Sequence, residues 1–515
     1  FLFLLTNQKR KKKNDFTYDD EDIFSPDGAA LAIRGIRALK PPLPYWAGFL
    51  KCLSNPCDPT MNPEGYIALC MAENKLVQES FARRLMQPAT AINAFSDSVV
   101  YGYNSFLGLP SAREAAAYFL ARRFLRARDG GHSSMYGSDL GGIMKPNSSS
   151  EADENSPPTS TPFIDRIDPE HVALSSGAAA VLNSLFFSLA NPGEAVLIPA
   201  PYYAAFENDM IVVAGLVPFP VHSENPIAGP TPKDLDIAKK KAEKEGLTVK
   251  ILLITNPNNP LAVVHSPQVM RAAVHWAKGN KIHTIVDEIY ALSLHKKDNN
   301  CFESIIKILH NNLGNDVHCV WAFSKDLAAS GFRIGLLYTQ NIKLMQALST
   351  LNIFSGVSHP MQMVASEILL DDFFLDSFLE ESRVMLVQSY QICAEKLDEM
   401  VIPYIPVEAA MFVYADFSAL IPSHDFEGEA KFTQLVTEYA RIVMTPGHTQ
   451  RDCKPGMFRI CYAWVTPDVL SVAMERLSIL VTKVRKMDWD DINEKSMRDV
   501  LKVGSSGYNN LSLNF

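Results

Sequence analysis

Blocks of apolar and polar residues follow one another along the chain in a pattern that predicts alternating helices and strands. Ala178–Ala190 is rich in apolar residues and predicts a helix, which the Asn-Pro-Gly sequence at 191–193 ends. The short apolar run Ala195–Pro199 predicts a buried strand. Further along, Ser266–Lys278 begins with a capping residue and a proline, so it predicts a second helix, with the Gly-Asn pair that follows at its exit.

Two more apolar runs extend this pattern. Val249–Thr255 and Lys281–Glu288 each predict a buried strand. The repeated order of strand, helix and strand indicates an α/β protein with a largely parallel sheet that helices cover on both faces. In such a sheet a binding site is expected at the carboxyl ends of the strands.

The segment 321–335 carries the first candidate chemistry. Lys325 follows an apolar run, and Arg333 comes eight residues later. A lysine at the mouth of a strand suits a pyridoxal-phosphate enzyme, because its amine forms a Schiff base with the cofactor aldehyde. An arginine nearby can bind the cofactor phosphate with two parallel hydrogen bonds. Taken alone, this pair is common in any surface loop.

Upstream residues strengthen this interpretation. Asp287 closes a predicted buried strand, where a carboxylate is rarely left unpaired, and Tyr290 follows it. A fixed carboxylate keeps a pyridine nitrogen protonated, while Tyr290 and an amide from the Asn-Pro segment 256–260 can bind the ring's phenolate oxygen. The Asp-x-x-Tyr pattern alone fits a capped strand end equally well. All these residue types in one chain order are harder to explain as coincidence.

The order of these motifs resembles that of a known family. The chain runs through Ser175-Ser-Gly-Ala178, Pro199-Ala-Pro-Tyr-Tyr203, Asn256-Pro, Asp287-x-x-Tyr290, Ser324-Lys325 and Phe332-Arg333. This order resembles the class I aminotransferases of pyridoxal-phosphate fold type I. Within them the chain is most similar to the 1-aminocyclopropane-1-carboxylate (ACC) synthase-like branch, from about Pro41 to Val484.

The resemblance implies a set of cofactor contacts. Lys325 would be the Schiff-base lysine and the base that moves the α-proton, and Asp287 would pair with the pyridinium nitrogen. The remaining cofactor-binding residues would be Tyr290 and Asn259 at the phenolate oxygen, Tyr203 stacked on the ring, and Gly177, Ala178, Ala179, Ser324 and Arg333 around the phosphate.

The resemblance also implies contacts with the substrate and with a second subunit. Arg459 would hold the α-carboxylate of a small amino-acid substrate, and Glu73 would lie near the substrate. A homodimer is expected, in which Tyr103 reaches the phosphate of the partner subunit's cofactor. A different alignment of this segment gives that role to Phe106.

Three positions depart from the family's pattern. Ala322 stands where many members have a serine, and Ala179 stands where a Ser or Thr hydroxyl commonly faces the phosphate. Ala262 replaces the usual glycine after Asn-Pro-Leu. Each missing hydroxyl is expected to cost about 0.5–1.5 kcal/mol, which weakens cofactor retention without abolishing it. Ser324 offers a hydroxyl that would compensate.

The fold implied by the resemblance has a large domain, whose mostly parallel sheet is flanked by helices, and a smaller α+β domain. A long helix near Phe374–Met400 would link them. The expected division is 1–40 as a basic, disordered N-terminal segment, 41–86 as the N-terminal part of the small domain, 87–356 as the large cofactor domain with a disordered insert at 128–162, 357–487 as the C-terminal small domain, and 488–515 as a loose tail.

Composition agrees with an ordinary enzyme. The chain has 515 residues, of which 47% are hydrophobic and 20% charged, and a net charge of −9. The negative charge argues against nucleic-acid or membrane-surface binding. The eight cysteines show no metal-binding spacing, so a reducing compartment, the cytoplasm, is expected. Phe1–Leu5 is too short to span a bilayer or to form the core of a signal peptide.

Four functions remain open from the sequence. The simplest is an aminotransferase, and the second is ACC synthase, which releases methylthioadenosine from S-adenosylmethionine by γ-elimination. The third is a carbon–sulfur lyase. The fourth is a catalytically inactive protein that keeps the fold, which Ala179 and Ala322 motivate but intact Lys325, Asp287 and Arg459 oppose. Nicotinamide-dependent and P-loop enzymes are disfavoured, because neither glycine-rich motif occurs.

Overall fold

The computed structural model describes residues 31–41, 43–125, 166–296 and 302–486. The predicted insert at 128–162 and the predicted tail at 488–515 lie outside these ranges, as does most of the N-terminal segment. The residues up to Pro41 form a unit of their own, in which the described element is the short helix α2 (Ile33–Arg37). All other described elements belong to the second unit, Pro42–Phe515.

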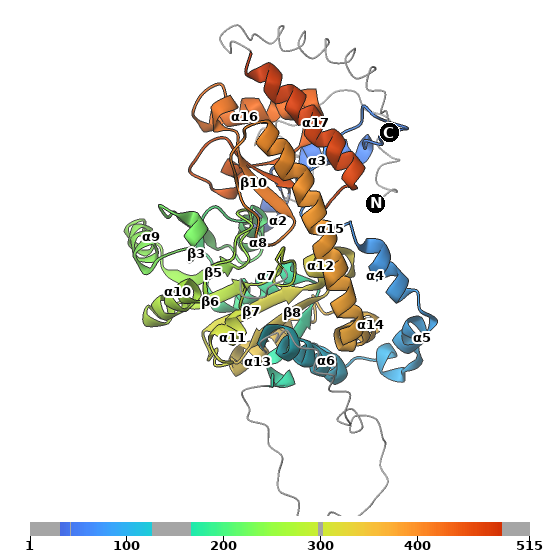
Figure 1. Cartoon of the computed structure of the whole chain (residues 1–515). Helices are drawn as coiled ribbons and strands as arrows, with labels where there is room; N and C mark the ends of the chain where they lie inside the picture. The colour runs from blue at the N-terminus through green and yellow to red at the C-terminus, as the bar shows by residue number, and fades with distance from the viewer. Residues whose placement is uncertain (1–30, 42, 126–165, 297–301, 487–515) are drawn as a thin grey trace, which may run out of the picture. The chain divides into compact units, whose positions relative to one another are not determined.

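A seven-stranded sheet lies at the centre of the second unit (Figure 1). Its strand order is β2-β8-β7-β6-β5-β3-β4. The strands are β2 (Val172–Ser175), β3 (Ala195–Pro199), β4 (Val217–Val221), β5 (Val249–Thr255), β6 (His283–Asp287), β7 (Val317–Ala322) and β8 (Gly335–Thr339). In this order, the neighbouring strands β7, β6, β5, β3 and β4 pair in parallel. Strand β8 runs antiparallel to β7 and β2. The predicted mostly parallel sheet is confirmed.

The helices of this unit have the following bounds. They are α3 (Trp46–Ser54), α4 (Gln78–Leu85), α5 (Pro88–Ser96), α6 (Pro110–Leu120), α7 (Ala178–Leu189), α8 (Ala205–Ile211), α9 (Pro232–Lys244), α10 (Pro267–Gly279), α11 (Ile305–Ile308), α12 (Phe323–Asp326), α13 (Ile342–Leu351), α14 (His359–Leu370), α15 (Asp372–Glu399), α16 (Phe426–Leu435) and α17 (Pro467–Val484).

Both faces of the large sheet are buried. Along β5, Leu252 and Ile254 pack with α6, α9 and α10, whereas Ile251 and Leu253 pack with α7, α8 and α13. Successive side chains of a strand point to opposite faces, so a strand covered on both faces must be apolar throughout. This explains why the apolar runs of the sequence marked β3 and β5 so clearly.

A second core is built around smaller sheets. The antiparallel order is β12-β13-β10-β9, and a parallel pair joins β1 to β11. These strands are β1 (Ile67–Ala68), β9 (Tyr404–Ile405), β10 (Phe412–Asp416), β11 (Ile442–Val443), β12 (Thr445–Pro446) and β13 (Met457–Cys461). We propose that the two cores mark the two expected domains, 87–356 and the pair 41–86 with 357–487. Val77 and Phe81 of the expected 41–86 part, and Ala365 and Leu369 of the expected 357–487 part, nevertheless pack in the core of the large sheet.

Helix α15 contributes to both cores. Leu375 and Phe378 pack with the helices of the large sheet, and Leu386 and Leu397 pack with the second core. The side chain of Asp371 caps the helix by accepting a hydrogen bond of 2.9 Å from the Phe374 N–H. Figure 1 shows it as one long helix that passes from the end of α14 to the region of α17. This matches the predicted long helix.

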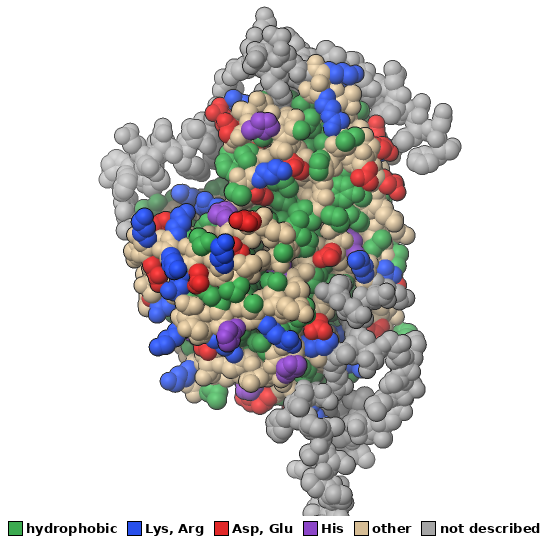
Figure 2. Space-filling view, turned by 60° about the vertical axis from the view of Figure 1, so that its left-hand side comes forward, with side chains coloured by type: hydrophobic (Ala, Val, Ile, Leu, Met, Phe, Trp, Pro, Cys, Tyr) green, Lys and Arg blue, Asp and Glu red, His purple; other side chains and the backbone are tan. Residues whose placement is uncertain are grey.

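The face drawn in Figure 2 carries acidic side chains among the basic ones. Among the ion pairs of the described residues, Lys239 and Glu243 of α9 lie with 2.6 Å between nitrogen and oxygen. No helix in the described ranges has the length and apolar character needed to cross a membrane. In the same ranges, no group of three or more His, Cys, Asp or Glu side chains is placed to hold a metal ion.

Candidate active site

The carboxyl ends of three neighbouring strands bring the predicted catalytic residues together. Asp287 is the last residue of β6, Lys325 lies in the single turn α12 directly after β7, and Asn259 follows β5. Strand β6 pairs with both β5 and β7 in parallel, so these ends meet at one edge of the sheet. Asp287 and Lys325 interact electrostatically across this edge.

The amine of Lys325 is held by a backbone carbonyl. Its Nζ donates a hydrogen bond of 2.7 Å to the Ala72 carbonyl oxygen. Burial lowers the pKa of Lys325, against the opposing effect of the Glu73 charge, and the nearby Arg459 guanidinium lowers it further. A lowered pKa leaves more of the amine neutral at pH 7, which is the form that attacks an aldehyde.

Asp326 fixes the turn that carries this lysine. Its carboxylate is buried and accepts three hydrogen bonds. The donors are Leu292 N at 3.0 Å, Ser293 Oγ at 2.6 Å and Trp321 Nε1 at 2.8 Å. Three donors on one buried carboxylate define its position closely. The backbone around Lys325 is therefore anchored to the segment after β6.

Asp287 has few partners for a buried carboxylate. Its side chain accepts one hydrogen bond, from the Ile289 N–H at 3.3 Å, and the residue is 4% exposed. Burial raises the pKa of Asp287 to about 7, against the opposing effects of the Ile289 N–H and the Lys325 charge. A cation beside this group would stabilise its charged form. The site therefore suits a protonated ring nitrogen.

Asn259 connects the predicted cofactor and substrate residues. Its Nδ2 donates to the Tyr290 hydroxyl at 3.2 Å, and its Oδ1 accepts from Arg459 Nη1 at 2.9 Å. Arg459 is 1% exposed, and its Nη2 donates to the Cys70 carbonyl at 2.6 Å and to Thr445 Oγ1 at 3.2 Å. Its Nε has no partner. No acidic side chain in the described ranges pairs with this buried cation.

Three tyrosines, Tyr45, Tyr203 and Tyr290, interact electrostatically with Arg459. Tyr203 packs edge-to-face on Phe206, with ring centres 5.4 Å apart, and it interacts electrostatically with Tyr290 and Arg459. Tyr45 is 8% exposed and also interacts with Arg459. Aromatic walls of this kind exclude water from a polar site, which strengthens the electrostatic interactions within it.

The start of helix α7 forms a cradle with Arg333. Gly177 has φ +84°, and a Cβ at this position would lie 2.6 Å from Arg333 Nη2, so glycine is required here. Arg333 donates to the Ser176 carbonyl at 3.2 Å and to the Ser330 carbonyl at 3.0 Å. The N–H groups in the first turn of a helix lack intrahelical partners, and they lie at the positive end of the helix dipole.

Of the three predicted backbone donors in this cradle, one is already used. The Gly177 N–H donates to the Ser175 carbonyl at 2.6 Å, which leaves those of Ala178 and Ala179 in the first turn. With Arg333 they form a binding site for an anion such as a phosphate. Ser324 lies in α12 beside Lys325 and is 6% exposed.

Glu73 lies against the loop between Lys325 and Arg333. Its Oε1 accepts a hydrogen bond of 2.6 Å from Ser330 Oγ, and the neighbouring Ala72 carbonyl holds the Lys325 amine. Tyr103 is not brought to this site within one chain. It is 97% exposed, and its ring contacts that of Phe106 with 6.4 Å between centres.

Some residues of the site were not predicted from the sequence. Ala72 and Cys70 act through backbone carbonyls, which no residue type reveals. Asp326 directly follows Lys325, the predicted Schiff-base lysine, so its position in the sequence could have suggested a structural role beside that residue. Tyr45 and Thr445 belong to segments with no marked pattern.

Comparisons with known proteins show which family and which folds the chain resembles. The model of the family described as aminotransferase class I and II matches residues 162–477. ACC synthase 6 of Arabidopsis thaliana is 27% identical over 86% of this chain and 83% of that protein, and ACC synthase-like protein 1 of the same plant is 29% identical over 85% and 83%. ACC synthase 1 of Prunus mume is 28% identical over 88% and 86%.

Solved structures resemble the fold. Thermus thermophilus aspartate aminotransferase with maleate superposes with a TM-score of 0.65 at 21% identity, covering 88% of this chain and all of that one. The aromatic aminotransferase of Pyrococcus horikoshii gives 0.63 at 20% identity, with 82% and 97% covered. At these identities the likeness shows a shared aminotransferase fold.

The residues present fit pyridoxal 5'-phosphate, the cofactor of this family. The Gly177–Arg333 cradle offers donors for a phosphate, Asp287 offers a carboxylate for a ring cation, and Lys325 offers an amine of lowered pKa. Arg459 remains a buried cation with an unpartnered Nε, which suits a carboxylate from outside the chain.

Proposed function

The chain belongs to the class I and II aminotransferase family, and on this premise we propose that it is a pyridoxal-phosphate-dependent enzyme acting on an α-amino acid, most simply an aminotransferase. The observation that carries the proposal is the buried Arg459, which has no acidic partner in the described ranges. It is joined through Asn259 to Tyr290 and acts electrostatically on Lys325. A buried unpaired cation is costly unless a ligand neutralises it.

The chain's residues would hold the cofactor at three points: its phosphate, its ring nitrogen and its ring oxygen. Arg333 and the first turn of α7 bind the phosphate, and Asp287 keeps the ring nitrogen protonated. Tyr290 and Asn259 donate to the ring oxygen. When bound, the cofactor supplies a cationic ring that withdraws electrons from the substrate's α-carbon.

Two basic residues of the chain bind and deprotonate the substrate, Arg459 as a cation and Lys325 as a neutral amine. Arg459 binds the α-carboxylate with two parallel hydrogen bonds, which fixes the orientation of the α-carbon. Lys325 Nζ, released from the Ala72 carbonyl, takes the proton from that carbon and later returns a proton. Burial favours the neutral amine needed for the first of these steps.

A second candidate is ACC synthase. Relatives that match 85–88% of this chain are named ACC synthase or ACC synthase-like protein. Glu73 accepts a hydrogen bond from Ser330 and directly follows Ala72, whose carbonyl binds the Lys325 amine. The two reactions share α-proton removal and differ in what the activated α-carbon does next.

A panel of substrates separates these functions. The purified, cofactor-loaded protein is incubated with single amino acids and with S-adenosylmethionine, and products are identified by mass spectrometry. An aminotransferase gives a keto acid and the pyridoxamine form of the cofactor. An ACC synthase gives methylthioadenosine. Ammonia with a keto acid, without pyridoxamine, indicates the lyase. A protein that never takes up the cofactor contradicts the proposal.

We also propose a homodimer. Tyr103 is 97% exposed and Phe354 is 87% exposed, and both lie in segments joined near the start of α7. Large exposed aromatic side chains beside an anion site favour contact with a second chain. A dimer in light scattering that Tyr103→Ala and Phe354→Ala together shift towards the monomer supports this, and a monomeric wild-type protein contradicts it.

A further inference from the structure

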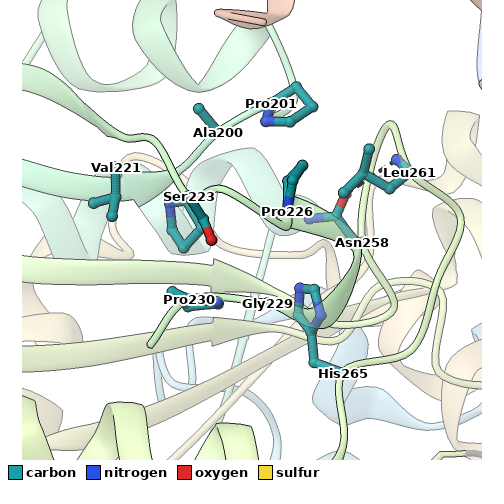
Figure 3. A pocket seen from close by; sticks show the side chains of 11 residues that line it. Ala200, Pro201, Val221, Ser223, Pro226, Gly229, Pro230, Asn258, Leu261 and His265 are labelled. Carbon is teal, nitrogen blue, oxygen red and sulfur yellow. Dashed lines mark hydrogen bonds between the residues drawn. The ribbon is translucent and has the colours of Figure 1, made fainter. Parts of the chain in front are cut away.

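A separate, small pocket lies beyond the active site, at the carboxyl ends of β3, β4 and β5 (Figure 3). Its wall consists of Pro199, Ala200, Pro201, Val221, Ser223, Pro226, Gly229, Pro230, Asn258, Leu261 and His265. None of the residues assigned above to cofactor or substrate is among them. Asn258, however, directly precedes Asn259, and Pro201 lies two residues before Tyr203.

His265 is the unusual member of this wall. It is 2% exposed, and its Nδ1 has no hydrogen-bond partner. Its backbone N–H is used, because it donates to Asn256 Oδ1 at 2.9 Å. A buried imidazole nitrogen without a partner is rare, since such a group loses its hydration and gains nothing in return.

Two further polar groups meet the same space. Asn258 is 4% exposed, and its Oδ1 already accepts from the Leu261 N–H at 3.0 Å, which leaves its Nδ2 as a donor. Ser223 Oγ accepts from the Asn225 N–H at 3.3 Å, which leaves its hydroxyl proton to donate. Figure 3 shows the Ser223 hydroxyl, the Asn258 side chain and the His265 ring around the space beside Pro226.

The wall carries no formal charge. It contains no Lys, Arg, Asp or Glu, and burial lowers the pKa of His265 to about 4, so the imidazole is neutral near pH 7. Four proline rings and the side chains of Val221 and Leu261 supply aliphatic surface. An ion would lose its hydration in such a pocket without gaining a counter-charge. The pocket therefore selects a small neutral molecule.

We propose that this pocket binds a small aliphatic alcohol or diol through His265, Asn258 and Ser223. One ligand hydroxyl accepts from Asn258 Nδ2 and donates to His265 Nδ1, and a second hydroxyl accepts from Ser223. The carbon atoms between them pack on the proline rings. A hydroxyl group suits this site because it is both donor and acceptor. The proposal is independent of the reaction that the enzyme performs.

The test uses the cofactor-loaded protein labelled with ¹⁵N-histidine and titrated with ethylene glycol. The His265 nitrogens, assigned by their loss in His265→Leu, are expected to shift in a saturable way. His275→Leu, a change at an exposed histidine of α10, keeps the response. Ser223→Ala weakens the affinity by about 3- to 10-fold, because one hydrogen bond is lost. Sodium acetate, as the charged control, gives no saturable shift.

A crystal structure of the cofactor-loaded protein soaked in ethylene glycol provides the second readout. The expected result is a diol in contact with Asn258 and His265. The proposal is overturned if the shifts rise linearly without saturation, if acetate binds as well as the diol, or if the soaked pocket holds a single water. If His265→Leu fails to fold, the Ser223→Ala titration and the soaked crystal still show whether the pocket binds the diol.

Discussion

Arg459 donates a hydrogen bond of 2.9 Å to the side-chain oxygen of Asn259, whose nitrogen in turn donates to Tyr290. A single amide thus orients the residue proposed to bind the substrate carboxylate and the residue proposed to bind the cofactor ring. Because an amide cannot rotate without breaking one of these bonds, the two positions are fixed relative to each other. This relationship yields the first two predictions.

Arg459→Lys is expected to weaken binding of the amino-acid substrate by about 10- to 100-fold, because an ammonium cannot form two parallel hydrogen bonds with a carboxylate. Affinity for pyridoxal phosphate should stay nearly unchanged. Both are measured from the cofactor's absorbance during titration. Arg451→Lys is the matched control, since Arg451 is exposed and pairs with Glu207, and neither residue is assigned to the substrate or the cofactor. An equal fall in both affinities would show that Arg459 has another role.

Tyr290→Phe keeps the ring that packs edge-to-face on Phe412, with 5.5 Å between centres, and removes the hydroxyl. The bound cofactor then loses a donor to its ring oxygen. The pH midpoint of its visible absorbance change is expected to rise by roughly one unit or more, the usual effect of losing a hydrogen bond to the charged form. Tyr462→Phe, a change at another buried tyrosine, should leave the midpoint in place. Equal midpoints in wild type and Tyr290→Phe would contradict the assignment.

Asp287→Asn tests whether this buried carboxyl group controls how the stability of the apoprotein depends on pH. Burial raises the pKa of Asp287 in the folded protein to about 7, above the unfolded value of about 3.9. The folded apoprotein therefore binds the proton more tightly, and its stability falls as pH rises from about 4 to 7. Asparagine cannot ionise, so the variant apoprotein should gain on the order of 2 kcal/mol relative to wild type between pH 5 and pH 8.

The measurement is the free energy of unfolding by urea at both pH values, with Glu114→Gln, a change at an exposed acid of α6, as control. With cofactor bound the effect on function is the opposite, because the ring cation loses its partner. Activity of Asp287→Asn is expected to fall by about 10²-fold or more. The same pH dependence in variant and wild type would exclude Asp287 as the titrating group.

Ala179→Ser is expected to strengthen cofactor retention. Ala179 is exposed in the first turn of α7, beside the Gly177–Arg333 cradle, and a serine there adds a hydroxyl donor for the phosphate. The gain should be about 2- to 10-fold in the dissociation constant, measured by dialysis and absorbance. Ala180→Ser, one position further into the helix, is the matched control. If both variants retain the cofactor equally, Ala179 does not face the phosphate.

The sequence located the main elements because their signals are local. The runs that mark β3 and β5 are apolar throughout and end at turn residues, so the predicted bounds agree with the structure. The direction of β8 was not predicted, because strand direction depends on pairing with distant residues and leaves no mark in an apolar run.

The site was predictable where side chains carry the chemistry and not where the backbone does. Lys325 and Asp287 stand out because charged groups at strand ends are rare. The Ala72 and Cys70 carbonyls come from residues that could be of any type. Ala262 was predictable in part. The sequence showed an alanine in place of the family's glycine, but only the structure shows that this residue has φ +57°, a conformation that favours glycine.

The most direct measurement is borohydride reduction of the cofactor-loaded protein, followed by peptide mass mapping. We expect one pyridoxyl group per chain, on Lys325, and none after Lys325→Ala, while Lys75→Ala, a change at an exposed lysine that lies over the ring of Trp464, keeps the label. A label on any other lysine, or a protein that remains unlabelled with pyridoxal phosphate in excess, would contradict the account.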